Sequence, residues 1–376
     1  MGLIIGPMAW SWKLARIAGI DVYVHATFFM VVAWIGAIYW NESHSAAAVV
    51  EGVGFLLALF GCVVLHEFGH ALTARRYGIR TRDITLLPIG GVARLERMPD
   101  KPVEELKVAL AGPAVNVVIA VLLAGWLQAS GDWESVDRLG VARGAFFERV
   151  MLANVFLAVF NLLPAFPMDG GRALRALLAT RVEYTRATQI AASIGQGMAI
   201  LFGFIGLQGN PMLIFIALFV WIGAGQEASM VQMKSALAGI PVRRAMLTDF
   251  RTLTPGNTLG DAADFVLSGS QQDFPVVGHG RLEGLLTRRD LLAALTRHGR
   301  DASVGENMRR ECATADASEM LEAVLARQHG RDCLTVPITE RGALIGLVTM
   351  DNVGEFLMIQ AADRQAEHRA ARPTRT

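Results

Sequence analysis

The chain has 376 residues, of which 53% are hydrophobic and only 18% charged, and its net charge is +1. Soluble globular proteins carry about 25% charged residues, and a neutral chain lacks the basic surface that binds nucleic acid, so the composition argues against both classes. Its cysteines, Cys62, Cys312 and Cys333, form no CxxC pair, which indicates neither a disulfide framework nor a cysteine zinc site. Because the apolar excess lies before about residue 230, we expect a membrane domain followed by a soluble one.

The apolar part contains several stretches of the length that a membrane helix needs. About 20 apolar residues in a helix cross a bilayer. We therefore expect a polytopic α-helical membrane domain with about six transmembrane helices, formed by residues 26–40, 46–74, 103–127, 145–163, 189–207 and 211–224.

Two short segments beside these stretches favour β-structure. Residues 19–25 alternate between apolar and polar, which suits a strand at the membrane surface. Residues 84–95 are too short to span and too apolar for a plain loop. We expect a short membrane-associated β-element here. Gly90 and Gly91 would let a second backbone approach it closely, although an ordinary turn is the competing interpretation.

A metal-binding motif ends the second stretch: His66-Glu67-Phe68-Gly69-His70. On a helix, HExxH places two imidazoles one turn apart on one face, where both can bind one Zn²⁺. Glu67 between them can take a proton from a water molecule at the metal. Ionisable residues inside a membrane segment are costly and usually functional, so the pattern favours a zinc site over a chance match.

The third and fourth stretches carry polar and helix-breaking residues. Asn116 lies inside the third, where it needs a partner; it is a candidate donor to an oxyanion, with contact between helices as the alternative. Pro164 and Pro167 interrupt the fourth, so Asp169 is expected in a non-helical turn before a flexible Gly-Gly pair. Irregular backbone at membrane depth is buried by protein or lines a polar cavity, which predicts a site at Asp169.

The distribution of basic residues predicts the orientation. Lys or Arg precedes the first stretch and follows the second and fourth, whereas the loops after the first and fifth have none. Cytoplasmic loops are enriched in Lys and Arg, so we expect both termini in the cytoplasm. HExxH and Asp169 then lie toward the same side of the membrane.

The region from Pro241 onward has a soluble composition and repeats itself after about 60 residues. One half ends in Gly-Leu-Leu-Thr-Arg-Arg-Asp (284–290) and the other in Gly-Leu-Val-Thr-Met-Asp-Asn (346–352). Each half predicts a strand, a helix, two strands and a helix. The expected domains are a membrane domain at 1–227, a linker at 228–240, soluble α+β repeats at 241–300 and 301–360, and a disordered tail at 361–376.

Three motifs together resemble one family. HExxH in the second stretch is followed by Ala-Gly-Pro-Ala-Val-Asn (111–116) and by Asn-x-x-Pro-x-x-Pro-x-Asp-Gly-Gly (161–171). In order, spacing and placement this set is similar to the site-2 protease family of intramembrane zinc proteases, over about residues 10–225. The two repeats resemble a CBS-domain pair, which some bacterial and archaeal site-2 proteases carry at the C-terminus.

This resemblance implies one Zn²⁺ per chain, with His66, His70 and Asp169 as ligands and Glu67 as the catalytic base. It implies hydrolysis of peptide bonds within or next to transmembrane helices of other proteins, in contact with membrane lipid, in a prokaryotic plasma membrane and without nucleic acid. We expect residues 84–95 to hold the unwound substrate as an added strand.

For the CBS pair the resemblance implies a ligand that modulates the protease. In such pairs the Asp of a Thr-x-x-Asp motif typically contacts a nucleotide ribose. Thr287 and Asp290 fit this pattern, and Thr349 fits it in the second half, where Asn352 replaces the Asp. An adenine nucleotide and a purely structural module both stay open, and a homodimer through these domains is expected as one arrangement.

Two other classes of protein stay open at this point. A CBS-regulated transporter or channel would explain the spans and the repeats, but it has no reason to hold the HExxH–Asp set. A catalytically inactive scaffold would bind substrates without cutting them, although Glu67 and all three ligand positions are present.

Overall fold

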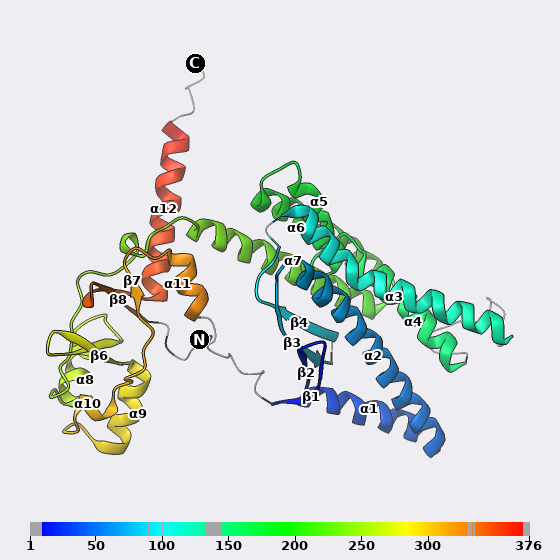
Figure 1. Cartoon of the computed structure of the whole chain (residues 1–376), viewed down its shortest axis with the longest axis horizontal. Helices are drawn as coiled ribbons and strands as arrows, with labels where there is room; N and C mark the ends of the chain where they lie inside the picture. The colour runs from blue at the N-terminus through cyan, green and yellow to red at the C-terminus, as the bar shows by residue number, and fades with distance from the viewer. Residues whose placement is uncertain are drawn as a thin grey trace. The chain divides into compact units, whose positions relative to one another are not determined.

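The computed structural model describes residues 10–88, 90–99, 101–131, 145–328, 333 and 335–370. The chain divides into two compact units, Met1–Gln232 and Met233–Thr376. In Figure 1 the first unit holds the blue to green elements, and the second holds the two halves of the repeated soluble region, coloured yellow to red.

Helices make up most of the first unit, as its apolar composition predicts. Among the described residues they are α1 (Ala26–Ser43), α2 (Ala46–Arg76), α3 (Pro102–Ser130), α4 (Phe146–Asn161), α5 (Asp169–Ala179), α6 (Tyr184–Gly206) and α7 (Pro211–Leu237). All six expected stretches are therefore helical, and the expected polytopic helical membrane domain is confirmed.

Four of these helices, α2, α3, α6 and α7, are long and apolar enough to cross a membrane. Within the described part of the chain, α4 is too short to qualify, having 16 residues, and α1, which has 18, is not apolar enough over its whole length. The polar residues Asn41–Ser43 occupy the last turn of α1, and Pro164 follows closely after the end of α4. The described residues thus contain four qualifying spans, which is roughly consistent with the expectation of about six transmembrane helices.

A four-stranded sheet forms the expected β-element and extends it. Its strands are β1 (Ser11–Ile17), β2 (Ile20–His25), β3 (Thr81–Leu87) and β4 (Gly90–Leu95), in the order β1-β2-β3-β4. Strands β2 and β3 are parallel and the other two pairs are antiparallel, so β4 lies at an edge. Strand β1 was not expected, because its sequence is too mixed to show a clear alternation.

The sheet packs on helix α2, which carries the HExxH motif. Buried Ile20, Val22 and Ile84 of the sheet form one core cluster with Phe68 and Ala71 of α2. Across β3 and β4, Arg94 binds Asp83 through two hydrogen bonds of 2.8 and 2.6 Å, a bidentate pair that fixes the hairpin. The sheet is therefore held directly against the face of α2 that follows the motif.

Helix α2 also packs closely on α3, and the two lie side by side with α4 (Figure 1). The approach is closest at Gly69, where an added Cβ would lie 2.7 Å from the Ala111 carbonyl oxygen. A side chain at this position of the motif would force the two helices apart.

The segment between α4 and α5 corrects one expectation. The turn at Pro164–Pro167 is non-helical, but Asp169 is the first residue of helix α5 and does not lie in a turn. The following glycines serve close packing: an added Cβ would collide with the Leu163 carbonyl at Gly170 and with the Ala165 backbone at Gly171. The helix start is thereby seated against the preceding loop.

The second unit repeats one arrangement of strands and helices. Its elements are η2 (Val242–Arg244), α8 (Leu259–Ser268), β5 (Phe274–Gly278), β6 (Arg281–Leu286), α9 (Arg288–His298), α10 (Val304–Asn307), β7 (Ala315–Asp316), α11 (Leu321–Gln328), β8 (Val336–Glu340), β9 (Ala343–Val348) and α12 (Met350–Ala370). The β5–β6 pairing, Phe274 with Leu286, recurs roughly 60 residues later in β8–β9 as Val336 with Val348. The repeat seen in the sequence is thus also present in the structure.

The end of the chain differs from expectation. Helix α12 continues to Ala370, so residues 361–370 are helical where a disordered tail was expected. This segment is rich in Ala, Gln, Glu and Arg, which are strong helix formers. Residues 371–376 lie outside the described part.

Candidate metal centre

Three buried side chains from two distant segments meet in the first unit. His66 and His70 lie on α2, and Asp169 begins α5. The Asp169 Oδ2 atom is 3.1 Å from His66 Nε2 and 3.0 Å from His70 Nε2, and the two Nε2 atoms are 3.0 Å apart. Each residue is at most 7% exposed. The structure therefore brings together the three expected metal ligands.

Hydrogen bonds on the far side of each imidazole define which nitrogen carries the proton. His70 Nδ1 lies 2.7 Å from the Val108 carbonyl oxygen, and His66 Nδ1 lies 2.5 Å from Asn116 Oδ1. Because a carbonyl oxygen only accepts, both Nδ1 atoms donate. Both Nε2 atoms then present lone pairs toward Asp169, as metal-ligating histidines do.

A metal ion fits this arrangement. Two nitrogen lone pairs and a carboxylate oxygen about 3 Å apart repel one another unless a cation lies between them. Two histidines and one carboxylate form a common catalytic zinc set, which leaves a fourth position open. Gly112 on α3 leaves the space, because an added Cβ would collide with Nε2 of both imidazoles. The residues present therefore suit Zn²⁺.

Asn116 lies behind the metal site, which differs from the oxyanion role expected for it. Its Oδ1 accepts the His66 hydrogen bond, and its Nδ2 donates to Asn154 Oδ1 at 2.8 Å. Asn154 in turn donates to Cys62 Sγ and to the Val150 carbonyl, at 3.2 and 2.9 Å. Asn116 and Asn154 are fully buried. This chain of amides fixes the orientation of the His66 ring.

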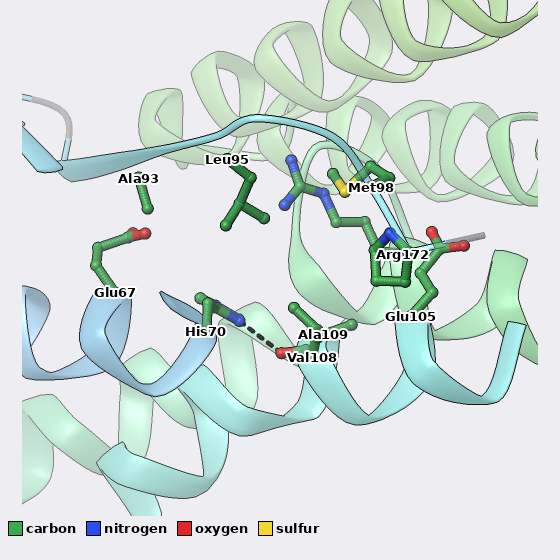
Figure 2. Close-up of a pocket in the computed structure, with 10 residues that line it drawn as sticks. Glu67, His70, Ala93, Leu95, Met98, Glu105, Val108, Ala109 and Arg172 are labelled. Atoms are coloured by element: carbon green, nitrogen blue, oxygen red, sulfur yellow. Dashed lines mark hydrogen bonds between the residues drawn. The ribbon is translucent and has the colours of Figure 1, made fainter. Parts of the chain in front are cut away.

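Glu67 faces a small cavity that the metal ligand His70 also lines. The cavity has a volume of about 30 Å³, room for about two water molecules. Figure 2 shows the Glu67 carboxyl group pointing toward Ala93 of β4, with His70 and Val108 below it. The side chains that line it with Glu67 and His70 include Ala93, Leu95, Met98, Glu105 and Arg172.

Strand β4 passes directly over Glu67. An added Cβ at Gly91 would lie 2.8 Å from Glu67 Cγ and 3.1 Å from Val63 of α2. Gly91 was expected to permit the close approach of a second backbone. In the structure it permits the close approach of β4 to helix α2. The open edge of β4 is thereby placed beside the general-base candidate.

A buried ion cluster holds helix α5 in place. Arg175 is 1% exposed and lies 2.5 and 2.8 Å from Glu105 Oε1 of α3 and 2.6 Å from Glu227 Oε1 of α7. Its guanidinium also contacts the rings of Phe166 and Tyr184, 5.1 and 5.0 Å from their centroids. Removing one partner of a buried ion pair is strongly destabilising, so the cluster anchors the helix that presents Asp169.

Several of these residues were not singled out from the sequence. Asn154, Glu105 and Arg175 all lie in or beside apolar helices, and each is buried and hydrogen-bonded. The available signal was a polar or ionisable residue within a membrane segment, which usually has a partner and a role. Their partners lie on other helices and could not be inferred from spacing.

The residues expected to bind a ligand in the CBS pair, Thr287, Asp290 and Thr349, belong to the second unit. Thr287 caps α9, and its hydroxyl donates to Asp290 Oδ2 at 2.6 Å. Arg309 binds both oxygens of Asp290, at 2.6 and 2.9 Å. Partial burial raises the pKa of Asp290, but the hydrogen bonds from Arg309 and Thr287 outweigh it, and the pKa lies below its ordinary value. Asp290 is therefore an ionised group with a resident partner.

The equivalent residues in the second half, Thr349 and Asn352, face a cavity. Thr349 Oγ1 accepts a hydrogen bond from the Asn352 backbone at 3.2 Å, and both residues line a cavity of about 560 Å³. The Asn352 Oδ1 atom is buried without a hydrogen-bond partner among the residues that the structure describes. Four carboxylates also line this cavity: Asp249, Asp273, Asp351 and Glu355.

We predict that Asn116→Ala weakens zinc binding by about 10- to 100-fold, because the His66 ring loses the partner that fixes its tautomer and orientation. The measurement is competition for zinc with a chromophoric chelator on the purified full-length protein. The exposed turn residue Asn210 supplies the control, since Asn210→Ala leaves the amide chain intact. Equal zinc affinity in the Asn116 variant and the control would contradict the positioning role.

Comparison with known proteins places the site in a family. Residues 54–135 and 134–202 match peptidase family M50, and residues 242–297 match the CBS domain. The zinc metalloprotease MJ0392 of Methanocaldococcus jannaschii is 32% identical over 92% of this chain and 96% of its own length. Stage IV sporulation protein FB of Bacillus subtilis is 28% identical over 50% of this chain and 66% of its own.

A solved structure is also similar. The site-2 protease from Methanocaldococcus jannaschii is 37% identical, covers 58% of this chain and 95% of its own, and superimposes with a TM-score of 0.43. The similarity to the zinc metalloprotease MJ0392 covers 92% of this chain and therefore includes both units. The chain therefore belongs to peptidase family M50, the site-2 proteases, and carries a CBS domain behind its membrane domain.

Proposed function

We propose that this intramembrane metalloprotease hydrolyses peptide bonds within or next to transmembrane helices of other proteins, with one zinc ion held by His66, His70 and Asp169 and with Glu67 as its base. The observation that carries this proposal is the meeting of two Nε2 lone pairs and one carboxylate, buried beside Glu67 among apolar helices. A transporter has no use for such a set, so that alternative is not favoured.

The chemistry divides between the metal and the chain. A zinc ion held by these residues would polarise the scissile carbonyl and acidify a water molecule. The chain supplies Glu67, whose carboxylate accepts a proton from the attacking water and later passes it to the leaving amine. Val108 and Asn116 hold the two imidazoles in one tautomer, and the small cavity beside Glu67 admits only a few waters.

The edge of β4 supplies a place for the substrate backbone. A transmembrane helix hides its amides in its own hydrogen bonds and must unwind before attack. An unwound segment could pair with the free edge of β4 by strand addition. Because Gly91 packs on Glu67, a strand bound there runs past the general base. This geometry supports the proposed role of residues 84–95 in binding the unwound substrate.

The soluble unit contains a cavity that suits a small ligand. Arg309 occupies the carboxylate of Asp290, so we favour the open cavity at Thr349 and Asn352 as the ligand site. An adenine nucleoside or nucleotide is the expected class, and a homodimer through this unit is the expected assembly.

The protein is an integral membrane protein. We propose that both termini face the cytoplasm of a prokaryotic cell, on the distribution of Lys and Arg between its loops. Labelling of a cysteine near the C-terminus by a membrane-impermeant reagent, in intact and in opened cells, tests the orientation.

The proposed function is tested by Glu67→Gln, which keeps the size of the side chain and removes its basicity. We expect the variant to bind zinc as the wild type does and to lose at least about 1,000-fold in the rate of cutting a transmembrane substrate, since Glu105, the other carboxylate in the cavity, is paired with Arg175. Glu96→Gln, on the exposed segment after β4, is the control. Zinc-free wild-type protein after metal-replete purification would refute the metalloprotease assignment.

The substrate position on β4 is tested by photo-crosslinking. A photoreactive residue at the exposed Val92 of β4 is expected to crosslink a transmembrane substrate trapped by the Glu67→Gln variant. The same residue at Val117, exposed on α3, is the control for general lipid-phase encounter. Crosslinking of equal strength from both positions would exclude β4 as the specific docking strand.

The ligand site is tested by the thermal stability of the full-length protein with adenosine, AMP and ATP. We expect at least one of these to raise the melting temperature, because a ligand that binds only the folded state stabilises it. Thr349→Val should abolish that shift, whereas Thr296→Val on the exposed face of α9 should keep it. A shift that survives Thr349→Val would move the site elsewhere.

A further inference from the structure

The cavity beside the metal ligands is lined by a positively charged side chain, Arg172, that has no role in the proposed reaction so far. Glu67 and Glu105 contribute carboxylates to its walls, and Arg172 contributes a guanidinium. Figure 2 shows the Arg172 side chain projecting into the pocket that Glu67 and His70 also face. The positive charge thus lines the same small cavity as the carboxyl group of Glu67.

Arg172 is carried by the helix that presents a metal ligand. It follows Asp169 by three residues on α5, and residues three apart lie on the same face of a helix. Its charge acts on the carboxylates of Glu67, Asp169 and Glu105. The start of α5, packed through its two glycines, therefore fixes the backbone of Arg172 relative to the site.

The Arg172 guanidinium acts on these carboxylates by its charge, without a direct polar contact to any residue that the structure describes. Within the described part of the chain Arg172 makes no hydrogen bond and no ion pair, although it is only partly exposed. Arg175, one turn further along α5, is by contrast bound to Glu105 and Glu227 and lies against two aromatic rings. A guanidinium offers five donors, and those of Arg172 are available to an acceptor that enters the cavity. An acceptor that arrives with the substrate would satisfy them.

Asn116, the residue considered as a donor to the oxyanion, is hydrogen-bonded to other protein residues. The Asn116 amide donates to Asn154, and its oxygen accepts from His66, so neither end is free to meet a substrate. The remaining lining residues of the cavity are apolar apart from Glu67, His70, Glu105 and Arg172. Of these, Arg172 is the one with unused donors and a positive charge.

We infer that Arg172 is a catalytic residue that donates hydrogen bonds to the scissile carbonyl oxygen as this oxygen becomes negatively charged. This inference rests on the proposed function. The water oxygen bonds to the carbonyl carbon, its proton goes to Glu67, and the carbonyl π pair moves to the oxygen that Arg172 contacts. When the C–N bond breaks, that pair returns to the carbonyl and the nitrogen takes the proton from Glu67. Arg172 itself exchanges no proton.

The test compares Arg172→Gln and Arg172→Lys in the full-length enzyme. Removing one donor to an oxyanion lowers kcat by about 100- to 1,000-fold. We expect Arg172→Gln to lower kcat by about 100-fold with KM within about 3-fold, and Arg172→Lys to restore part of the loss, because it keeps the charge. Arg181→Gln, exposed after the end of the same helix, is the matched control and should cut at the wild-type rate.

Two binding measurements separate this role from a structural one. Arg172→Gln should weaken binding of a phosphinic peptide, whose anionic tetrahedral group imitates the charged oxygen, about as much as it lowers kcat/KM. Binding of the uncut substrate, measured in the Glu67→Gln background, should be unchanged. Zinc content and melting temperature should equal those of the wild type.

Several results would overturn the inference while leaving the protease assignment intact. They are wild-type kcat in Arg172→Gln, unchanged phosphinic-peptide affinity, loss of zinc from the variant, or loss only of inhibition by the cleaved product. The last result would mean that Arg172 holds the product carboxylate and not the transition state. A wild-type enzyme that holds no zinc and cuts nothing would instead defeat the proposed function, and this inference would fall with it.

Discussion

The repulsion between three electron-rich atoms is the constraint on which the membrane unit depends. Nε2 of His66, Nε2 of His70 and Oδ2 of Asp169 are held about 3 Å apart in apolar surroundings. Without a cation such an arrangement is unfavourable, so the fold must hold it from several directions. The α2–α3 contact at Gly69, the seat of α5 on its glycines and the Arg175 ion cluster each hold one of the two segments that meet there.

The polar groups of the site are arranged in layers. The ligands face inward, the Val108 carbonyl and the Asn116–Asn154 chain lie behind the imidazoles, and Arg175 lies behind the helix that bears Asp169. The Val108 carbonyl and the Asn116 amide satisfy the imidazole Nδ1 atoms, which matters where no bulk water can do so. A single amide chain from His66 to Cys62 thus ties α2, α3 and α4 together.

The parts of this arrangement that follow local rules could be predicted from the sequence. The spacing of His66 and His70 and the apolar periods of the helices are local, and both were expected in the right places. The partners of Asn116 were not predictable, because Asn154 lies on another helix and one polar residue in a span does not reveal its neighbour. Asp169 was expected in a turn because two prolines precede it, yet their effect ends before the residue itself, where the glycines allow tight helical packing. Strand β1 lacks a clean alternation, and its place is set by pairing with β2.

The proposed addition of substrate to the edge strand β4 has a consequence for which proteins such an enzyme selects. A strand that binds another backbone through amide hydrogen bonds reads little of the side chains, since every residue except proline offers the same N–H and C=O groups. Discrimination then falls on the step before binding, in which a helix gives up its own hydrogen bonds. Glycine weakens a helix by about 1 kcal/mol relative to alanine and proline by about 3 kcal/mol. Two substrates with unrelated sequences are then cut equally well if their helices unwind equally easily at the same depth in the membrane. A helix that does not unwind escapes cleavage because of its stability alone.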